Sequence, residues 1–92
     1  MNILGYIYEI DRTQTEDTLA SMGRCMGKML KIEIAKELNS QQAQSTILHE
    51  FIEAINFHLN LQLEHRTIAA LETGIYQVLT SNGVDLSPLE KD

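Results

Sequence analysis

Apolar residues recur at helical spacing through the middle of the chain, and this pattern constrains the fold more than any other feature. Asn39 and Ser40 suit a helix N-cap, and Gln42 stands three residues after Asn39, as in a capping box. The residues that follow predict a helix from about residue 40 to about residue 60. They form one wide stripe that faces a sheet or a second helix: Ile47, Leu48, Phe51, Ile52, Ile55 and Leu59.

A second helix is predicted after the short link 61–64, over about residues 65–81. Its apolar residues recur at i, i+3, i+7 and i+10, and they are Ile68, Leu71, Ile75 and Val78. Asn82 and Gly83 supply the stop, because both tolerate the left-handed conformation that closes a helix. The tail 84–92, which carries Pro88 as the only proline, is expected to be extended or frayed.

The first 35 residues are rich in β-branched and aromatic residues, which is typical of strands. Ile3 to Ile10 predicts the first strand, and the polar segment Arg12 to Asp17 predicts an exposed turn. A second strand is expected over Leu19 to Cys25, with a short helix within Asp17 to Met29 as the alternative. Met29 to Ala35 predicts the third strand, because its apolar residues stand at alternate positions.

These elements predict a single α+β domain over residues 1–92, a small antiparallel sheet followed by two packed helices. Gly23 and Gly27 bracket the turn expected between the second and third strands. A chain of 92 residues buries roughly 60–70% of its unfolded surface. That burial suffices for one core and excludes a second domain.

The acidic composition limits the partners of the chain. The net charge is −6 and the seven Lys and Arg residues are scattered, which argues against nucleic acid and anionic membrane surfaces as partners. No run of about 20 apolar residues is present, and Met1 to Ile10 lacks the basic start of a signal peptide. Cys25 is the single cysteine, so no intrachain disulfide forms and the expected location is the cytosol. We expect Cys25 to be a small, buried or half-buried thiol without a catalytic role.

The segment Thr46 to Ile55 contains the pattern HExxE, which differs from the HExxH helix of metallopeptidases in its last residue. Residues four apart on a helix share a face, so His49 and Glu53 can bind one ion while Glu50 faces what the ion binds. Zinc binds histidine nitrogen and carboxylate oxygen at similar distances of about 2.0 to 2.2 Å. The pattern predicts a divalent metal site, and the alternative is a solvated polar pair that binds no metal.

A third ligand is expected from the second helix, because catalytic zinc sites usually have three protein ligands. Glu72 is the preferred candidate, since Ile68 and Ile75 flank it and place it near the seam between the helices. The resulting His/Glu/Glu set also suits manganese or iron. His65 lies seven residues earlier on nearly the same face and is the alternative ligand, although we expect it nearer to His58, with both histidines solvated.

With these residues the chain resembles a family of small phage and prophage proteins with a zincin-like fold. In that family an apolar strand ending in I-x-I runs through a polar link into T-x-L-H-E-x-x-H/E-A-I. The resemblance covers residues 3–89. The matching stretches are Lys31 to Ile34, Thr46 to Asn56 and Ala70 to Leu79.

The resemblance implies zinc held by His49 and by the residue at position 53, with Glu50 as general base, in the cytosol of a phage host. Glu53 in place of a histidine adds negative charge at the ion, so we expect a poorer Lewis acid and weak or lost peptidase activity. Two other functions remain open. One is a non-enzymatic accessory factor that binds a protein through the acidic surface, and the other is a structural module that forms a homodimer through strand edges and the second helix.

Overall fold

The first thirteen residues form a hairpin followed by a separate strand. The computed structural model describes residues 1–91, apart from the side chains of residues 17, 19 and 20. β1 (Asn2–Ile3) and β2 (Tyr6–Ile7) pair antiparallel around Leu4 and Gly5, whose φ angles are 55° and 89°. Glycine adopts a positive φ without steric penalty. This turn breaks the single strand that was predicted for Ile3 to Ile10.

Three further strands form a mixed sheet. They are β3 (Glu9–Thr13), β4 (Gly23–Met26) and β5 (Lys31–Ala35), in the order β3-β5-β4. The central strand β5 runs parallel to β3 and antiparallel to β4. The predicted α+β class is confirmed. The sheet is mixed where an antiparallel one was predicted, because the chain crosses over between β3 and the β4–β5 hairpin.

A short helix, α1 (Glu16–Ser21), forms that crossover and replaces the first part of the strand predicted for Leu19 to Cys25. Thr15 and Thr18 cap it reciprocally: each side-chain oxygen accepts a hydrogen bond from the backbone N–H of the other. Such a cap satisfies donors that the first turn of a helix leaves free. The alternative prediction of a short helix in this region is therefore correct for its first part.

The turn between β4 and β5 is displaced from its predicted place. Gly23 begins β4, and the connection is a 3-10 segment, η1 (Gly27–Met29), closed by Leu30 in the left-handed conformation with φ 53°. Along β5, Ile32 and Ile34 lie fully buried in the core as their spacing predicted, but the strand does not alternate between buried and exposed residues. Glu33 between them is also buried, paired with Arg24 at 2.6 Å.

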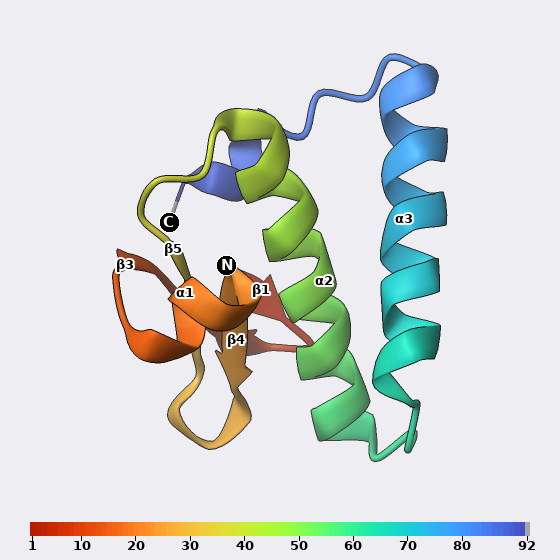
Figure 1. The fold of residues 1–92 in the computed structure, drawn as a ribbon. Coiled ribbons are helices and arrows are strands. Elements are labelled where there is room, and N and C mark those ends of the chain that lie inside the picture. Colours follow the sequence, from red (N-terminus) through yellow and green to blue (C-terminus); the bar gives the residue numbers. More distant parts are fainter. Residues whose placement is uncertain (92) are drawn as a thin grey trace.

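The two long helices, α2 (Ser40–Leu59) and α3 (His65–Ser81), confirm both helix predictions. Asn39 and Gln42 form the predicted capping box at the start of α2. Figure 1 shows the two helices side by side and antiparallel, with α2 next to the sheet and α3 on its outer side. This arrangement makes α2 the central element of the fold.

The core has two parts, one on each side of α2. Between α2 and the strands lie the buried apolar residues Ile3, Tyr8, Ile32, Ile34, Ala43, Ile47 and Ala54. Between α2 and α3 lie Leu48, Ile52 and Ile68. Full burial of a large apolar side chain stabilises a fold by about 1.5 to 3 kcal/mol. Burial on both sides fixes the rotation of α2 about its axis, and with it the direction of the polar residues between the two apolar stripes.

The tail differs from its prediction. Ser87–Glu90 forms a 3-10 helix, η2, in which Leu89 packs against the core. Glu90 accepts hydrogen bonds from Arg12 and Gln44, so the segment is anchored rather than extended or frayed. Within residues 1–91, no helix is long and apolar enough to cross a membrane.

Candidate metal centre

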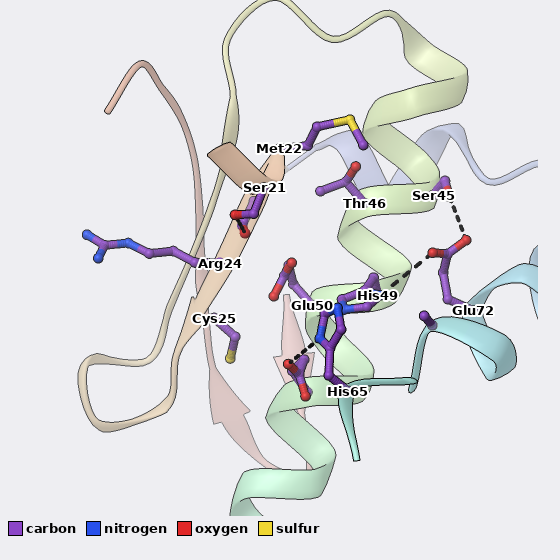
Figure 2. Close-up of a pocket in the computed structure, with 13 residues that line it drawn as sticks. Ser21, Met22, Arg24, Cys25, Ser45, Thr46, His49, Glu50, His65 and Glu72 are labelled. Atoms are coloured by element: carbon purple, nitrogen blue, oxygen red, sulfur yellow. Dashed lines mark hydrogen bonds and ion pairs between the residues drawn. The ribbon is translucent and has the colours of Figure 1, made fainter. Parts of the chain in front are cut away.

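The polar face of α2 carries His49 and Glu53 one turn apart, and the first turn of α3 brings His65 beside them. His65 Nδ1 lies 3.9 Å from Glu53 Oε2, and the rings of His49 and His65 have centroids 5.0 Å apart, tilted by 56°. One ligand atom from each of the three residues lies within 4.8 Å of the other two. Figure 2 shows the two histidine rings close together beside α2.

This group has the donors that a zinc ion uses. Two imidazoles and one carboxylate form a set found in catalytic zinc sites. In a tetrahedral site with bonds of about 2.1 Å, the ligand atoms lie about 3.4 Å apart. To hold an ion, the ligand atoms of the three side chains would therefore need to move about 1 to 1.5 Å closer to one another. His65 can make that adjustment, because its side chain is 77% exposed at the rim of the group.

Glu72, which the sequence suggested as the third ligand, reaches His49 from another direction. Its Oε1 lies 3.7 Å from His49 Nδ1, and its Oε2 accepts a hydrogen bond of 2.7 Å from Ser45 Oγ. Glu72 therefore contacts the group through His49, while His65 lies beside Glu53. The geometry favours His65, the alternative ligand of the sequence analysis, over Glu72.

The register between the helices explains this outcome. α3 begins immediately after a tight link in which Asn60 and Gln62 have φ angles of 50° and 58°. His65 consequently lies level with Glu53, and Glu72, seven residues or about 10 Å further along the helix axis, lies level with Ser45. The helical pattern alone does not contain this offset, because it depends on the conformation of the link.

Glu50 projects from α2 toward β4 and is almost completely buried, with 6% of its surface exposed. Burial, and then the nearby negative charge of Glu53, raise the pKa of Glu50 from 4.5 to about 7. The strand can approach this carboxyl because β4 begins with glycine. A Cβ atom on Gly23 would lie 2.6 Å from Thr46 Cγ2 and 3.3 Å from Glu50 Oε2.

These residues line a pocket of about 510 Å³ between β4, α2 and α3. Ser21, Met22 and the first residues of β4 form one wall, and the helices form the other (Figure 2). Cys25 lies in the first wall and is half-buried, as expected. Burial, followed by the charges of Glu50 and Glu53, raises the pKa of Cys25 to about 11, so it remains a protonated thiol at neutral pH.

The third histidine of the chain, His58, lies in a separate aromatic group. Its Nε2 is 2.6 Å from the hydroxyl of Tyr8, and its ring stacks on Tyr6 at a centroid distance of 4.2 Å. His65 was expected toward His58, with both histidines solvated, but it lies beside His49 and Glu53 instead. His58 is half-buried against the two tyrosines, and only His65 is exposed. His58 holds the N-terminal hairpin against α2.

No protein-family model, no curated protein and no solved structure matches this chain. The resemblance to zincin-like phage proteins therefore stays a prediction, and any inference on function depends on the geometry of the site itself.

Proposed function

We propose that this protein binds a divalent cation, preferably zinc, through His49, Glu53 and His65 and hydrolyses a peptide-type bond with Glu50 as general base. The observation that carries the proposal is the convergence of the three ligand side chains beside the buried carboxyl of Glu50. Convergence matters because a histidine and a glutamate on one helix are common without a metal, whereas a further histidine from a second helix is not required by helix packing.

The donor set suits catalysis better than the set expected from the sequence. When bound, a divalent cation would supply Lewis acidity, which polarises a carbonyl group and makes water more acidic. His65 is a neutral ligand where Glu72 would be anionic. The set with His65 therefore leaves more of the positive charge effective than His49, Glu53 and Glu72 together would. This removes part of the reason to expect weak activity.

Glu50 is placed to move a proton. It follows His49 directly in the chain, yet its carboxyl projects between the ligand face of α2 and β4 (Figure 2). A carboxylate at that position can accept a proton from an attacking water and donate it to the leaving amine. The surrounding wall limits access of bulk water to this carboxyl, which is 6% exposed.

An extended peptide is the substrate class that we propose. β4 lies at the edge of the described sheet and contributes Gly23, Arg24 and Cys25 to the wall of the pocket. A strand at the edge of a sheet can pair with an extended peptide through main-chain hydrogen bonds. We place this activity in the cytosol, because the single cysteine fits a reducing compartment.

The metal site is tested by zinc titration of chelator-stripped protein against a chromophoric chelator. His49→Ala and His65→Ala should each lower zinc affinity at least about 100-fold, because each removes a ligand. His58→Gln is the matched control, since it changes the one histidine that contacts Tyr8 and Tyr6 instead. Equal affinity in all three variants would contradict the proposed ligand set.

Hydrolysis is tested separately, with the zinc-loaded protein and a library of peptides read by mass spectrometry. Glu50→Gln should retain the fold and zinc binding but lose hydrolysis, because it removes the proton acceptor at nearly constant shape.

A second candidate function is a metal-stabilised protein-binding module. The 77% exposure of the His65 side chain favours it, because a ligand at the rim closes the site loosely. Zinc binding without cleavage of any peptide would support this second function over the first.

A further inference from the structure

One stripe of α3 exposes apolar side chains that the fold leaves uncovered. Of the four residues whose spacing predicted this helix, Ile68 is fully buried against α2, whereas Leu71, Ile75 and Val78 are 42%, 39% and 54% exposed. These three residues stand at i, i+4 and i+7, so they form one continuous line along the helix. The line is rotated away from His65, Glu72 and the pocket. We refer to it as the α3 stripe.

The helix that carries the α3 stripe is almost free of charged residues. From residue 67 to residue 81 the sequence contains one charged side chain, Glu72, which lies against His49 and Ser45 on α2. The whole chain carries a net charge of −6. Two copies of so acidic a protein repel each other over most approaches, and this helix offers a face where they can meet without placing like charges opposite one another.

We propose that the α3 stripe binds a second copy of this chain, in a two-fold symmetric dimer in which the two α3 helices pack antiparallel. An isologous contact needs a self-complementary surface, and an uncharged apolar line satisfies that condition. Gly74 lies beside the line near its middle, and a Cβ atom added there would meet nothing within 4 Å. Small residues at such a point let two helices approach closely.

The proposed contact between the two α3 helices is small, so the dimer should be weak. A helix of 17 residues is about 25 Å long, and a single helix pair buries less than the roughly 1,200 to 2,000 Å² of stable interfaces. We therefore expect a reversible dimer with a Kd on the order of 10 to 100 μM. The dimer leaves the pocket free, so it is independent of the proposed metal chemistry.

Sedimentation equilibrium of the full chain tests this proposal, over concentrations from about 5 to about 500 μM that bracket the expected Kd. The average mass should rise from 10.4 kDa toward twice that value. Val78→Glu should stay monomeric throughout, since it places two carboxylates at the contact, and circular dichroism should show an unchanged helix content. Thr73→Glu, which adds the same charge to the opposite side of α3, should dimerise like the original chain.

Disulfide crosslinking gives a second, independent measurement. In a Cys25→Ser background, Gly74→Cys should crosslink to its own copy under mild oxidation, because residues near a two-fold axis meet their equivalents. Thr73→Cys, on the far side of the helix, should stay uncrosslinked under the same conditions. A protein that is monomeric at every concentration would overturn the proposal. Equal crosslinking of the two variants would also overturn it.

Discussion

Glu72 and His49 face each other across the seam between α3 and α2, with Glu72 Oε1 3.7 Å from His49 Nδ1. Ser45, one turn before His49, donates a hydrogen bond of 2.7 Å to the other oxygen of Glu72 and so fixes the carboxylate. A carboxylate beside one ring nitrogen of a metal-binding histidine orients the ring and leaves the second nitrogen for the ion. In the metal site that we propose, Glu72 is thus better placed to orient His49 than to act as a ligand.

This relationship makes Glu72 and His65 experimentally distinct. Glu72→Gln keeps the shape of the side chain but removes its charge, and we expect zinc affinity to fall about 10- to 100-fold. His65→Ala removes a proposed ligand and should lower zinc affinity further. Affinities from chelator competition at one pH give the comparison. If Glu72→Gln weakened zinc binding more than His65→Ala, Glu72 would be the ligand and His65 the peripheral residue.

The buried carboxyl of Glu50 should make the stability of the metal-free protein depend on pH. Its pKa rises from 4.5 to about 7 on folding, so the folded state favours the protonated form. The stabilising contribution of protonated Glu50 is fully present below pH 4.5, is lost as the pH rises toward 7, and stays lost above that. The linked change is about 3 kcal/mol. Urea denaturation in the presence of a chelator at pH 5 and pH 8 should show it.

Glu50→Gln is the control for that pH dependence, because the amide does not titrate. The variant should gain stability relative to the original chain at pH 8 and should lose the part of the pH dependence that Glu50 causes. If the two proteins showed the same difference between pH 5 and pH 8, another group would carry the effect.

The helices were predictable from the sequence because their signals are local. The Asn39 capping box and the apolar spacing located α2, and Asn82 with Gly83 located the end of α3. The first 35 residues were less predictable. Alternating apolar residues do not show where a strand breaks, and the turn at Leu4 depends on a positive φ that leucine seldom adopts. The reciprocal cap of Thr15 and Thr18 was a missed signal for α1.

The candidate site was predictable only where its residues share one helix. His49, Glu50 and Glu53 follow from the spacing within α2, since helix geometry fixes their relative directions. Predicting which residue of α3 joins this group would have required knowledge of the register between the two helices. That register depends on the link, where Asn60 and Gln62 both adopt the left-handed conformation. A pattern of residue types carries no information on such an offset, so Glu72 and His65 could not be separated.

Substitution by alanine should change stability in opposite directions at two glycines. Gly23→Ala places a Cβ atom 2.6 Å from Thr46 Cγ2 and 3.0 Å from the Glu33 carbonyl oxygen, so β4 must move away from α2. We expect a loss of about 1 to 3 kcal/mol in the free energy of unfolding. Gly74→Ala meets open space on a helix and should gain about 0.5 to 1 kcal/mol. Urea denaturation at low protein concentration measures both, and a loss of stability in Gly74→Ala would contradict the exposed position of that residue.

The link between α2 and α3 stores strain at Gln62, whose φ is 58°. This conformation is less stable by about 1 to 2 kcal/mol for a residue with a side chain than for glycine. Glycine partly offsets this advantage, because it loses more conformational entropy on folding. Gln62→Gly should therefore raise the free energy of unfolding by about 0.5 to 1 kcal/mol, and Gln62→Val, with a β-branched side chain, should lower it. Zinc affinity should be unchanged in Gln62→Gly, since the link keeps its conformation and His65 stays level with Glu53. Equal stability of the glycine and valine variants would show that the link does not hold residue 62 in the left-handed conformation in solution.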